Sequence, residues 1–318
     1  MPTPSTYLDF EKPVAELETK IAELQAAGGS AIDEDVARLR EKAAKQLRDI
    51  YSHLTPWQKT QVARHPDRPH FIDYLDSLFD DFVELAGDRK FMNDDAIMGG
   101  LARFRGRSVV VIGHEKGRDT QTRLKHNFGM GKPEGYRKAV RLIELAGRFS
   151  LPVITLVDTS GAFPGKGGEE RGQAEALARA IEACMTLETP LVSVIVGEGG
   201  SGGAVALASG NRVLMMEHAV YSVISPEGAA SILFRDAKRA KDTAEAMKIT
   251  AQDLEKFRIV DGVVSEPMGG AHRDPKAAIQ RVGDAIEAAL SSLSGLSPAD
   301  LKRQRKERFY AIGRQVPA

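Results

Sequence analysis

A run of seven residues that contains five glycines constrains the fold of this chain more than any other feature. Residues Gly197 to Gly203 read Gly-Glu-Gly-Gly-Ser-Gly-Gly, between the apolar segment 191–196 and a second apolar segment, 204–208. This order predicts a strand, a loop that lacks most Cβ atoms, and a helix. Because the first N–H groups of a helix have no partner within it, the loop is predicted to let a ligand approach the backbone.

The segments around this run repeat the same pattern. A strand is predicted at 153–157, a Gly-rich loop at 158–168 and a helix at 169–187, and strands at 212–216 and 220–224 follow the run. A β-hairpin is predicted at 96–114, followed by a basic loop at 118–132 and a helix at 133–149. Ser225 and Pro226 are typical of the start of another helix. Such repeats predict an α/β protein with a largely parallel sheet and with ligands at the carboxyl ends of the strands.

Helices are predicted at both ends of the chain. Apolar residues recur at helical spacing through 14–24 and 32–50, on either side of Gly28-Gly29-Ser30, which predicts a helical hairpin. The hairpin either packs on its own domain or forms an arm that binds a partner. The acidic, aromatic stretch 66–95 has helical spacing from Phe71 to Phe82, which favours a solvated helix face over a metal site. Two further helices are expected at 275–293 and 298–312, and the basic run 302–308 is interpreted as a solvated face.

The composition excludes several classes of function. Lys plus Arg and Asp plus Glu each number 44, so no overall charge favours nucleic acid or an anionic membrane. Cys184 is the single cysteine, which excludes an internal disulfide and a cysteine-based zinc site and suits the reducing cytoplasm. The start of the chain has no signal-peptide pattern, and no apolar run approaches the roughly 18 residues of a membrane-spanning helix.

Three interpretations of the glycine run remain. Gly197, Gly199 and Gly202 match the dinucleotide-binding pattern, with Glu217 at the place of a ribose-binding acid. Ser201 between Gly199 and Gly203 matches a hydrolase nucleophile pattern, for which Asp261 and His272 would have to complete a triad. In the third interpretation, adjacent backbone N–H groups stabilise a developing oxyanion, as in enolate chemistry on acyl thioesters. Close packing of helix on sheet would also require some of these glycines.

Several longer motifs resemble those of one family. They are the segments 84–89 (ELAGDR), 127–130 (NFGM), 133–138 (PEGYRK), 169–172 (EERG), 197–203, 221–228 (YSVISPEG) and 267–273 (PMGGAHR). In this order they resemble the alpha subunit of bacterial acetyl-CoA carboxylase carboxyltransferase over nearly the whole chain. Ser160 and Gly131 depart from the pattern, since the family is expected to have proline at both positions.

The resemblance implies a crotonase/ClpP-like superhelix of ββα units, with the N-terminal helical hairpin and C-terminal helices added. It divides the chain into a helical region at 1–95, a carboxyltransferase domain at 96–294 and a terminal helix at 295–318. It also implies an α2β2 assembly that moves a carboxyl group from biotin on the biotin carboxyl carrier protein to acetyl-CoA, giving malonyl-CoA in fatty acid biosynthesis. Biotin carboxylase and the beta subunit are the other implied partners. Zinc is expected on the beta subunit, and this chain alone is expected to bind no cofactor.

The resemblance also implies the site residues. The backbone N–H groups of Gly202 and Gly203 would form the oxyanion hole for the biotin ureido oxygen, while the beta subunit would hold the acetyl-CoA enolate. Further biotin or substrate contacts are expected at Gly199, Gly200, Ser201, Gly161, Ala162, Phe163, Ser225, Pro226, Glu227 and Gly228.

Four basic residues of the loop at 118–132 have two interpretations. Arg118, Arg123, Lys125 and Lys132 either contact CoA phosphates or the carboxylate in transfer, or lie on a solvated loop or subunit interface. Propionyl-CoA or another acyl-CoA remains an alternative substrate, and an NAD-binding oxidoreductase is the alternative from another class.

Overall fold

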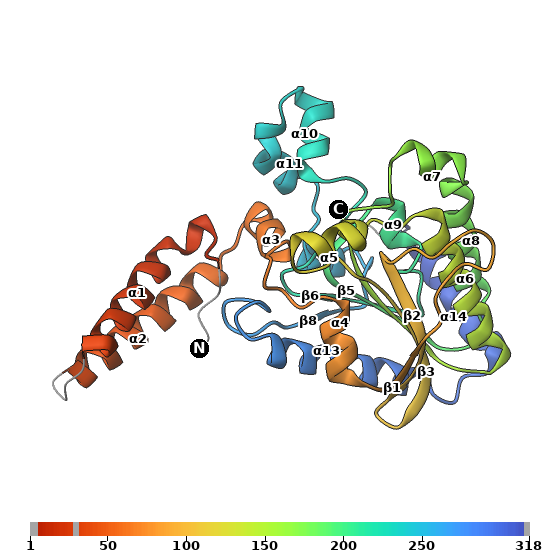
Figure 1. The fold of residues 1–318 in the computed structure, drawn as a ribbon, viewed down its shortest axis with the longest axis horizontal. Helices are drawn as coiled ribbons and strands as arrows, with labels where there is room; N and C mark the ends of the chain where they lie inside the picture. The colour runs from red at the N-terminus through yellow and green to blue at the C-terminus, as the bar shows by residue number, and fades with distance from the viewer. Residues whose placement is uncertain (1–5, 28–31, 315–318) are drawn as a thin grey trace.

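The computed structural model describes residues 6–27 and 32–314, and within them the centre of the molecule is an eight-stranded sheet flanked by helices (Figure 1). The strands are β1 (Phe79–Glu84), β2 (Ile97–Phe104), β3 (Arg107–His114), β4 (Val153–Thr159), β5 (Leu191–Gly200), β6 (Arg212–Met216), β7 (Val220–Ser222) and β8 (Gly262–Val264). Their order is β1-β2-β3-β4-β5-β6-β8, and β7 pairs with the end of β5. The first two pairings are antiparallel, and the pairings from β3 onward are parallel. The predicted α/β class with a largely parallel sheet is therefore confirmed.

The central strands β4 and β5 are buried along their whole length. Apolar runs of this kind are typical of parallel strands that are covered on both faces. The prediction that β5 ends at Val196 is wrong, because the strand continues to Gly200. Here Glu198 and Gly199 pair with Val220 and Tyr221 of β7, and these ladders keep the first glycines of the run in extended conformation. The segment predicted as a loop is thus half strand and half helix start.

Helices cover both faces of the sheet. α6 packs on α8, which α14 also contacts, while α13 packs against β5 and α4 (Figure 1). The helices are α1 (Lys12–Ala27), α2 (Ile32–Tyr51), α3 (Pro56–Ala63), α4 (Phe71–Leu78), α5 (Thr120–Lys125), α6 (Pro133–Arg148), α7 (Lys166–Glu170), α8 (Gln173–Thr186), α9 (Ser201–Val205), α10 (Pro226–Phe234), α11 (Ala240–Ala246), α12 (Ala251–Lys256), α13 (Pro275–Leu293) and α14 (Pro298–Ala311), with single turns of 3-10 helix at Asp9–Glu11, Asn127–Gly129 and Ala237–Arg239.

The two predicted N-terminal helices are confirmed as α1 and α2, which extend away from the sheet (Figure 1). Ile21, Val36 and Ala43 form a small core between them. The predicted turn at residues 28–30 lies outside the described residues. The base of the hairpin is joined to the body by the buried Arg273, whose guanidinium pairs with Glu11 and Glu18.

Two predicted helices are shorter in the structure. The one expected to reach Phe82 ends at Leu78, because Phe79 pairs with Phe104 and begins β1. The one expected at 169–187 is divided into α7 and α8 at Gly172, whose φ of +80° lies in the left-handed region. Short elements such as α3, α12 and β8 have too few residues to show a clear period in the sequence.

Candidate functional site

The two Gly-rich segments that follow β4 and lie at the end of β5 meet backbone to backbone. A Cβ atom on Gly200 would lie 2.2 Å from the carbonyl oxygen of Ser160, and one on Gly203 would lie 2.6 Å from the backbone nitrogen of Ala162. Neither position has room for a side chain. Close packing therefore accounts for these two glycines, as one interpretation of the sequence allowed.

Gly202 is different. A Cβ atom here would meet only the Cδ1 atom of Leu177, at an ordinary 3.5 Å, and the residue is half-buried. Gly202 and Ser201 line a cavity of about 440 Å³, which we call the Gly202 cavity. Its other lining residues are mostly apolar and come from the ends of several elements: Val205, Tyr221, Ser222, Val223, Met247, Lys248, Ile249, Leu254 and Ile259.

The backbone N–H groups of Gly202 and Gly203 belong to the first turn of α9. N–H groups in a first turn have no partner within the helix, and the N-cap residue, Gly200, makes no side-chain cap. Since α9 has only five residues, its dipole is small, and an anion at this helix start would be bound mainly by the two N–H groups. Chemically, two adjacent donors beside an apolar cavity can stabilise an oxygen that gains negative charge.

Arg64 joins two segments of the predicted site. Its guanidinium donates to Glu198 of β5 and to Glu227 at the start of α10, each at 2.6 Å. Burial acts to lower the pKa of Arg64, but its bonds to the two carboxylates raise it overall. At the same helix start, the Ser225 hydroxyl accepts the N–H of Gly228 at 3.1 Å, so the predicted N-cap is confirmed. Arg64 could not be predicted from the sequence, because no motif includes it and it lies 134 residues from Glu198.

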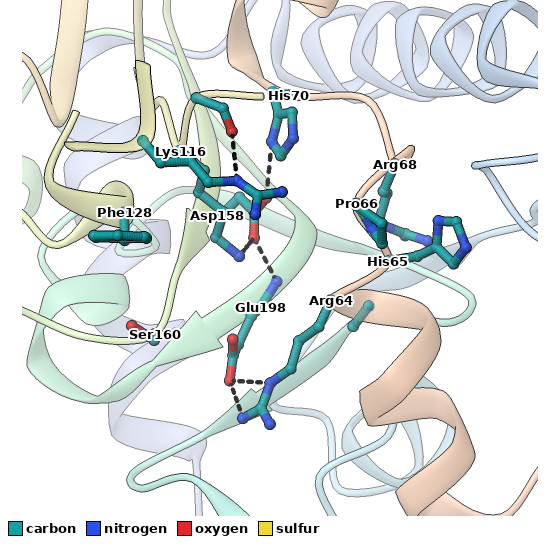
Figure 2. Close-up of a pocket in the computed structure, with 13 residues that line it drawn as sticks. Arg64, His65, Pro66, Arg68, His70, Lys116, Phe128, Asp158, Ser160 and Glu198 are labelled. Carbon is teal, nitrogen blue, oxygen red and sulfur yellow. Dashed lines mark hydrogen bonds and ion pairs between the residues drawn. The ribbon is translucent and has the colours of Figure 1, made fainter. Parts of the chain in front are cut away.

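A second cavity of about 230 Å³, which we call the Arg123 cavity, lies at the carboxyl ends of β3, β4 and β5. Figure 2 shows His70 and Lys116 directed toward Asp158 in it. The Lys116 ammonium lies 2.6 Å from Asp158, and the backbone N–H of Glu198 donates to the same carboxylate at 2.8 Å. Burial acts to raise the pKa of Asp158, but the charge of Lys116 and the hydrogen bonds that the carboxylate accepts together lower it.

The four predicted basic residues do not converge on one site. Arg123 lines the Arg123 cavity, whereas Arg118 forms an ion pair with Asp73. Lys125 is exposed on α5, and the Lys132 ammonium lies 5.8 Å from the centre of the Phe163 ring. Phe163 donates its backbone N–H to the carbonyl of Gly131 at 2.9 Å. This predicted site residue therefore lies beside Gly131, one of the two positions where the family is expected to have proline.

The structure does not assemble the hydrolase triad. Asp261 accepts from the backbone of Val213 and pairs with Arg308. The His272 ring stacks on His65 with a centroid distance of 3.9 Å. Neither residue lines the Gly202 cavity, which contains Ser201.

The structure also does not support Glu217 as the ribose-binding acid of the dinucleotide interpretation. Glu217 does not line the Gly202 cavity, and one of its carboxylate oxygens accepts the backbone N–H of Glu266 at 2.9 Å.

Within residues 6–27 and 32–314, no group of three or more His, Cys, Asp or Glu side chains is arranged to hold a metal ion. None of the helices described has the length and apolar character needed to cross a membrane.

Comparisons with known proteins identify relatives over nearly the full chain. The family model described as "Acetyl co-enzyme A carboxylase carboxyltransferase-like" matches residues 7–313. The acetyl-coenzyme A carboxylase carboxyl transferase subunit alpha of Caulobacter vibrioides is 64% identical over 312 residues, which are 97% of this chain and 98% of that protein.

Solved structures share the fold at low sequence identity. The transcarboxylase 12S structure aligns with a TM-score of 0.56 at 20% identity and covers 70% of this chain and 42% of that one. A Pseudomonas malonate decarboxylase hetero-tetramer in complex with coenzyme A aligns with a TM-score of 0.56 at 16% identity, covering 68% and 87%. These similarities confirm the predicted crotonase-like fold.

Proposed function

The chain belongs to the acetyl-CoA carboxylase carboxyltransferase family, as an alpha subunit of this biotin-dependent transferase, and from this premise we propose how it takes part in carboxyl transfer. It acts with a beta subunit to move the carboxyl group of carboxybiotin, on the biotin carboxyl carrier protein, to acetyl-CoA. The product is malonyl-CoA, in the first committed step of fatty acid biosynthesis.

The observation that carries the proposal is the pair of adjacent N–H groups on Gly202, which lines the Gly202 cavity, and on Gly203, the next residue of α9. When the bond between the biotin nitrogen and the carboxyl carbon breaks, its electron pair stays on the ureido group and the ureido oxygen gains negative charge. Donors already in place stabilise that charge without reorganising during the reaction. Removal of one such donor typically costs about 2.7–4 kcal/mol of barrier stabilisation. Backbone donors explain why no catalytic triad is needed.

The other predicted contacts give this hole its shape. Gly199 and Gly200 continue β5 to the start of α9, and Gly161 and Ala162 pack against Gly203. Arg64 fixes the 225–228 segment relative to β5 through Glu227. We propose that biotin enters along this apolar cavity, with Ser201 and the start of α10 at its edge.

The proposed assembly leaves half of the chemistry to another chain. The beta subunit supplies the second oxyanion hole for acetyl-CoA and carries the zinc, and biotin carboxylase regenerates carboxybiotin in the cytoplasm. Residues 96–294 are the proposed carboxyltransferase domain, with 1–95 and 295–318 as additions. The N-terminal hairpin stays a candidate arm for one of these partners.

A substitution at Gly202 tests the proposal. In Gly202→Val the Cβ atom has room beside Leu177, so we expect the chain to fold, and the added methyl groups would occupy the cavity that Gly202 lines. We expect transfer from carboxybiotin to acetyl-CoA to fall at least a hundredfold in the reconstituted enzyme, with assembly unchanged. Gly147→Val on the exposed end of α6 is the matched control, since its Cβ atom would meet only Leu187 Cδ1, at 3.4 Å. Near-normal transfer by Gly202→Val would refute the proposed role.

The acyl group is a separate question, because the beta subunit contributes much of its pocket. We propose acetyl-CoA as the acceptor, and propionyl-CoA is the alternative. A comparison of kcat/KM for the two thioesters in the reconstituted enzyme decides between them: a preference for propionyl-CoA would replace acetyl-CoA in the proposal.

A further inference from the structure

The Arg123 cavity holds polar groups that the proposed function does not use. It lies where β3, β4 and β5 end, and Gly202 lines a different cavity. With a volume of about 230 Å³ it is smaller than the roughly 300–1,000 Å³ of pockets for drug-sized ligands, so a nucleotide or a CoA molecule does not fit inside.

The carboxylates in and around this cavity already have donors. Asp158 accepts from the Lys116 ammonium and from the backbone N–H of Glu198. The Glu198 carboxylate accepts from two nitrogens of Arg64, at 2.6 and 3.1 Å. Glu115, next to Lys116, accepts two backbone N–H groups. Additional donors in the cavity are therefore not needed to neutralise these acids.

Three donors are left over. The Arg123 guanidinium pairs with no carboxylate in the part of the chain that the structure describes, and its Nε atom donates to the carbonyl of Gly117 at 3.5 Å. His70 is only 7% exposed. Its Nδ1 atom lies 4.0 Å from the Asp158 carboxylate, beyond hydrogen-bond distance, and neither ring nitrogen has a hydrogen-bond partner. The exposed Ser160 lines the same cavity. Buried polar side chains without a partner are rare, so His70 indicates a missing acceptor.

Burial keeps the His70 ring neutral. Its pKa is lowered mainly by desolvation, and the positive charges of Lys116 and Arg118 lower it further, against the opposing effect of Asp158 and Glu115. A neutral ring donates one N–H group. Together with the planar fork of Arg123, this arrangement suits a single carboxylate.

We infer that the Arg123 cavity binds a short-chain aliphatic carboxylate, held by the guanidinium of Arg123, the ring N–H of His70 and the hydroxyl of Ser160. Ala63, Pro66 and Phe128 supply apolar walls for the aliphatic part. Because Lys116 and Arg64 are already paired with Asp158 and Glu198, Arg123 offers one unpaired positive charge, which matches a singly charged carboxylate better than a doubly charged phosphate. Gly202 does not line this cavity, and binding here can be measured without carboxyl transfer.

Nuclear magnetic resonance of the histidine rings tests this inference on the full chain. The seven histidines give few signals, and His70→Gln identifies the signal of His70. Butyrate, butyramide and inorganic phosphate are titrated separately at constant ionic strength. Butyrate is expected to shift the His70 signal saturably, while the neutral butyramide and phosphate bind at least tenfold more weakly.

The Arg123→Gln variant is expected to weaken butyrate binding by at least tenfold, because it removes the charged fork. Arg148→Gln, at the exposed end of α6, removes one positive charge elsewhere and is expected to leave the dissociation constant unchanged. Circular dichroism confirms that both variants fold. The inference is overturned if butyrate produces no saturable shift, if butyramide or phosphate binds as tightly as butyrate, or if Arg123→Gln binds butyrate like the wild type.

Discussion

The two neighbouring glycines at the start of α9 should respond oppositely to the same small change. In Gly203→Ala the new Cβ atom would lie 2.6 Å from Ala162 N and 2.8 Å from Gly161 C, where ordinary contacts begin at 3.4 Å. The atoms that must move by roughly 0.8 Å are backbone atoms, and the hydroxyl of the fully buried Tyr136 closes the third side at 2.9 Å. In Gly202→Ala the Cβ atom makes one ordinary contact.

These distances set the expected magnitudes. Overpacking of a closely packed site costs about 1–3 kcal/mol, and the backbone contacts put Gly203→Ala at about 3 kcal/mol of lost unfolding free energy. Gly202→Ala is expected to be neutral, or to stabilise by up to about 1 kcal/mol, because alanine is the better helix former.

Urea unfolding followed by circular dichroism measures both effects. The midpoint of Gly203→Ala should fall well below that of the wild type at an unchanged m-value, while the midpoint of Gly202→Ala should equal or exceed it. Unfolding free energies within 1 kcal/mol of each other for the two variants would refute the reasoning, since it assigns packing to Gly203 and not to Gly202.

Three further predictions concern buried or half-buried ionisable side chains. The pKa of His114 is lowered to about 3 by burial, so the unfolded chain takes up the proton first and the folded state loses stability as pH falls below 6.5. The free energy of unfolding of the wild type minus that of His114→Phe, measured by urea unfolding from pH 7 to 5, should fall by up to about 1.4 kcal/mol per pH unit. Unfolding free energies of the two proteins that change in parallel with pH would contradict this. Arg305 is buried and donates to the carbonyls of Cys184, Leu187 and Thr189, so Arg305→Met should cost about 3 kcal/mol and increase hydrogen exchange in α14; unchanged exchange would remove this anchoring role. Arg64→Gln should cost about 2 kcal/mol by leaving Glu198 without its partner, and Glu198→Gln in the same chain should restore part of that loss; additive effects in the double-mutant cycle would disprove the coupling.

The elements that the sequence predicted well are those with long, regular patterns. The hairpin at 97–114, the strands β4 and β5 and the helices α6 and α13 all have apolar periods that their burial explains. The predictions were wrong where strand pairing overrides the apolar period of the segment. Phe79 follows a helical period, yet its partner Phe104 places it in a strand, and a single-sequence period cannot reveal a partner 25 residues away.

Only some residues of the candidate site could be predicted from the sequence. Its glycines were found because the motif is local, and the start of α10 was found because Ser225 and Pro226 are a local signal. Arg64 was missed because its two acceptors are distant in sequence, and the folded sheet alone brings the three together. The basic loop was predicted as one group, but its charges separate because α5 and the turn after it direct Arg123 and Lys132 to different neighbours.

Glycine serves two physical needs in the 197–203 run, which is why short patterns were ambiguous there. A tight junction of two backbones and a backbone donor site both require missing Cβ atoms, so dinucleotide sites, nucleophile turns and oxyanion holes produce overlapping motifs. The space around each position separates the two needs. Gly200 and Gly203 have backbone atoms where a side chain would lie, whereas Gly202 faces a cavity. A glycine that packing does not require is therefore the better indicator of a ligand, and within the 197–203 run Gly202 has the most room for a side chain.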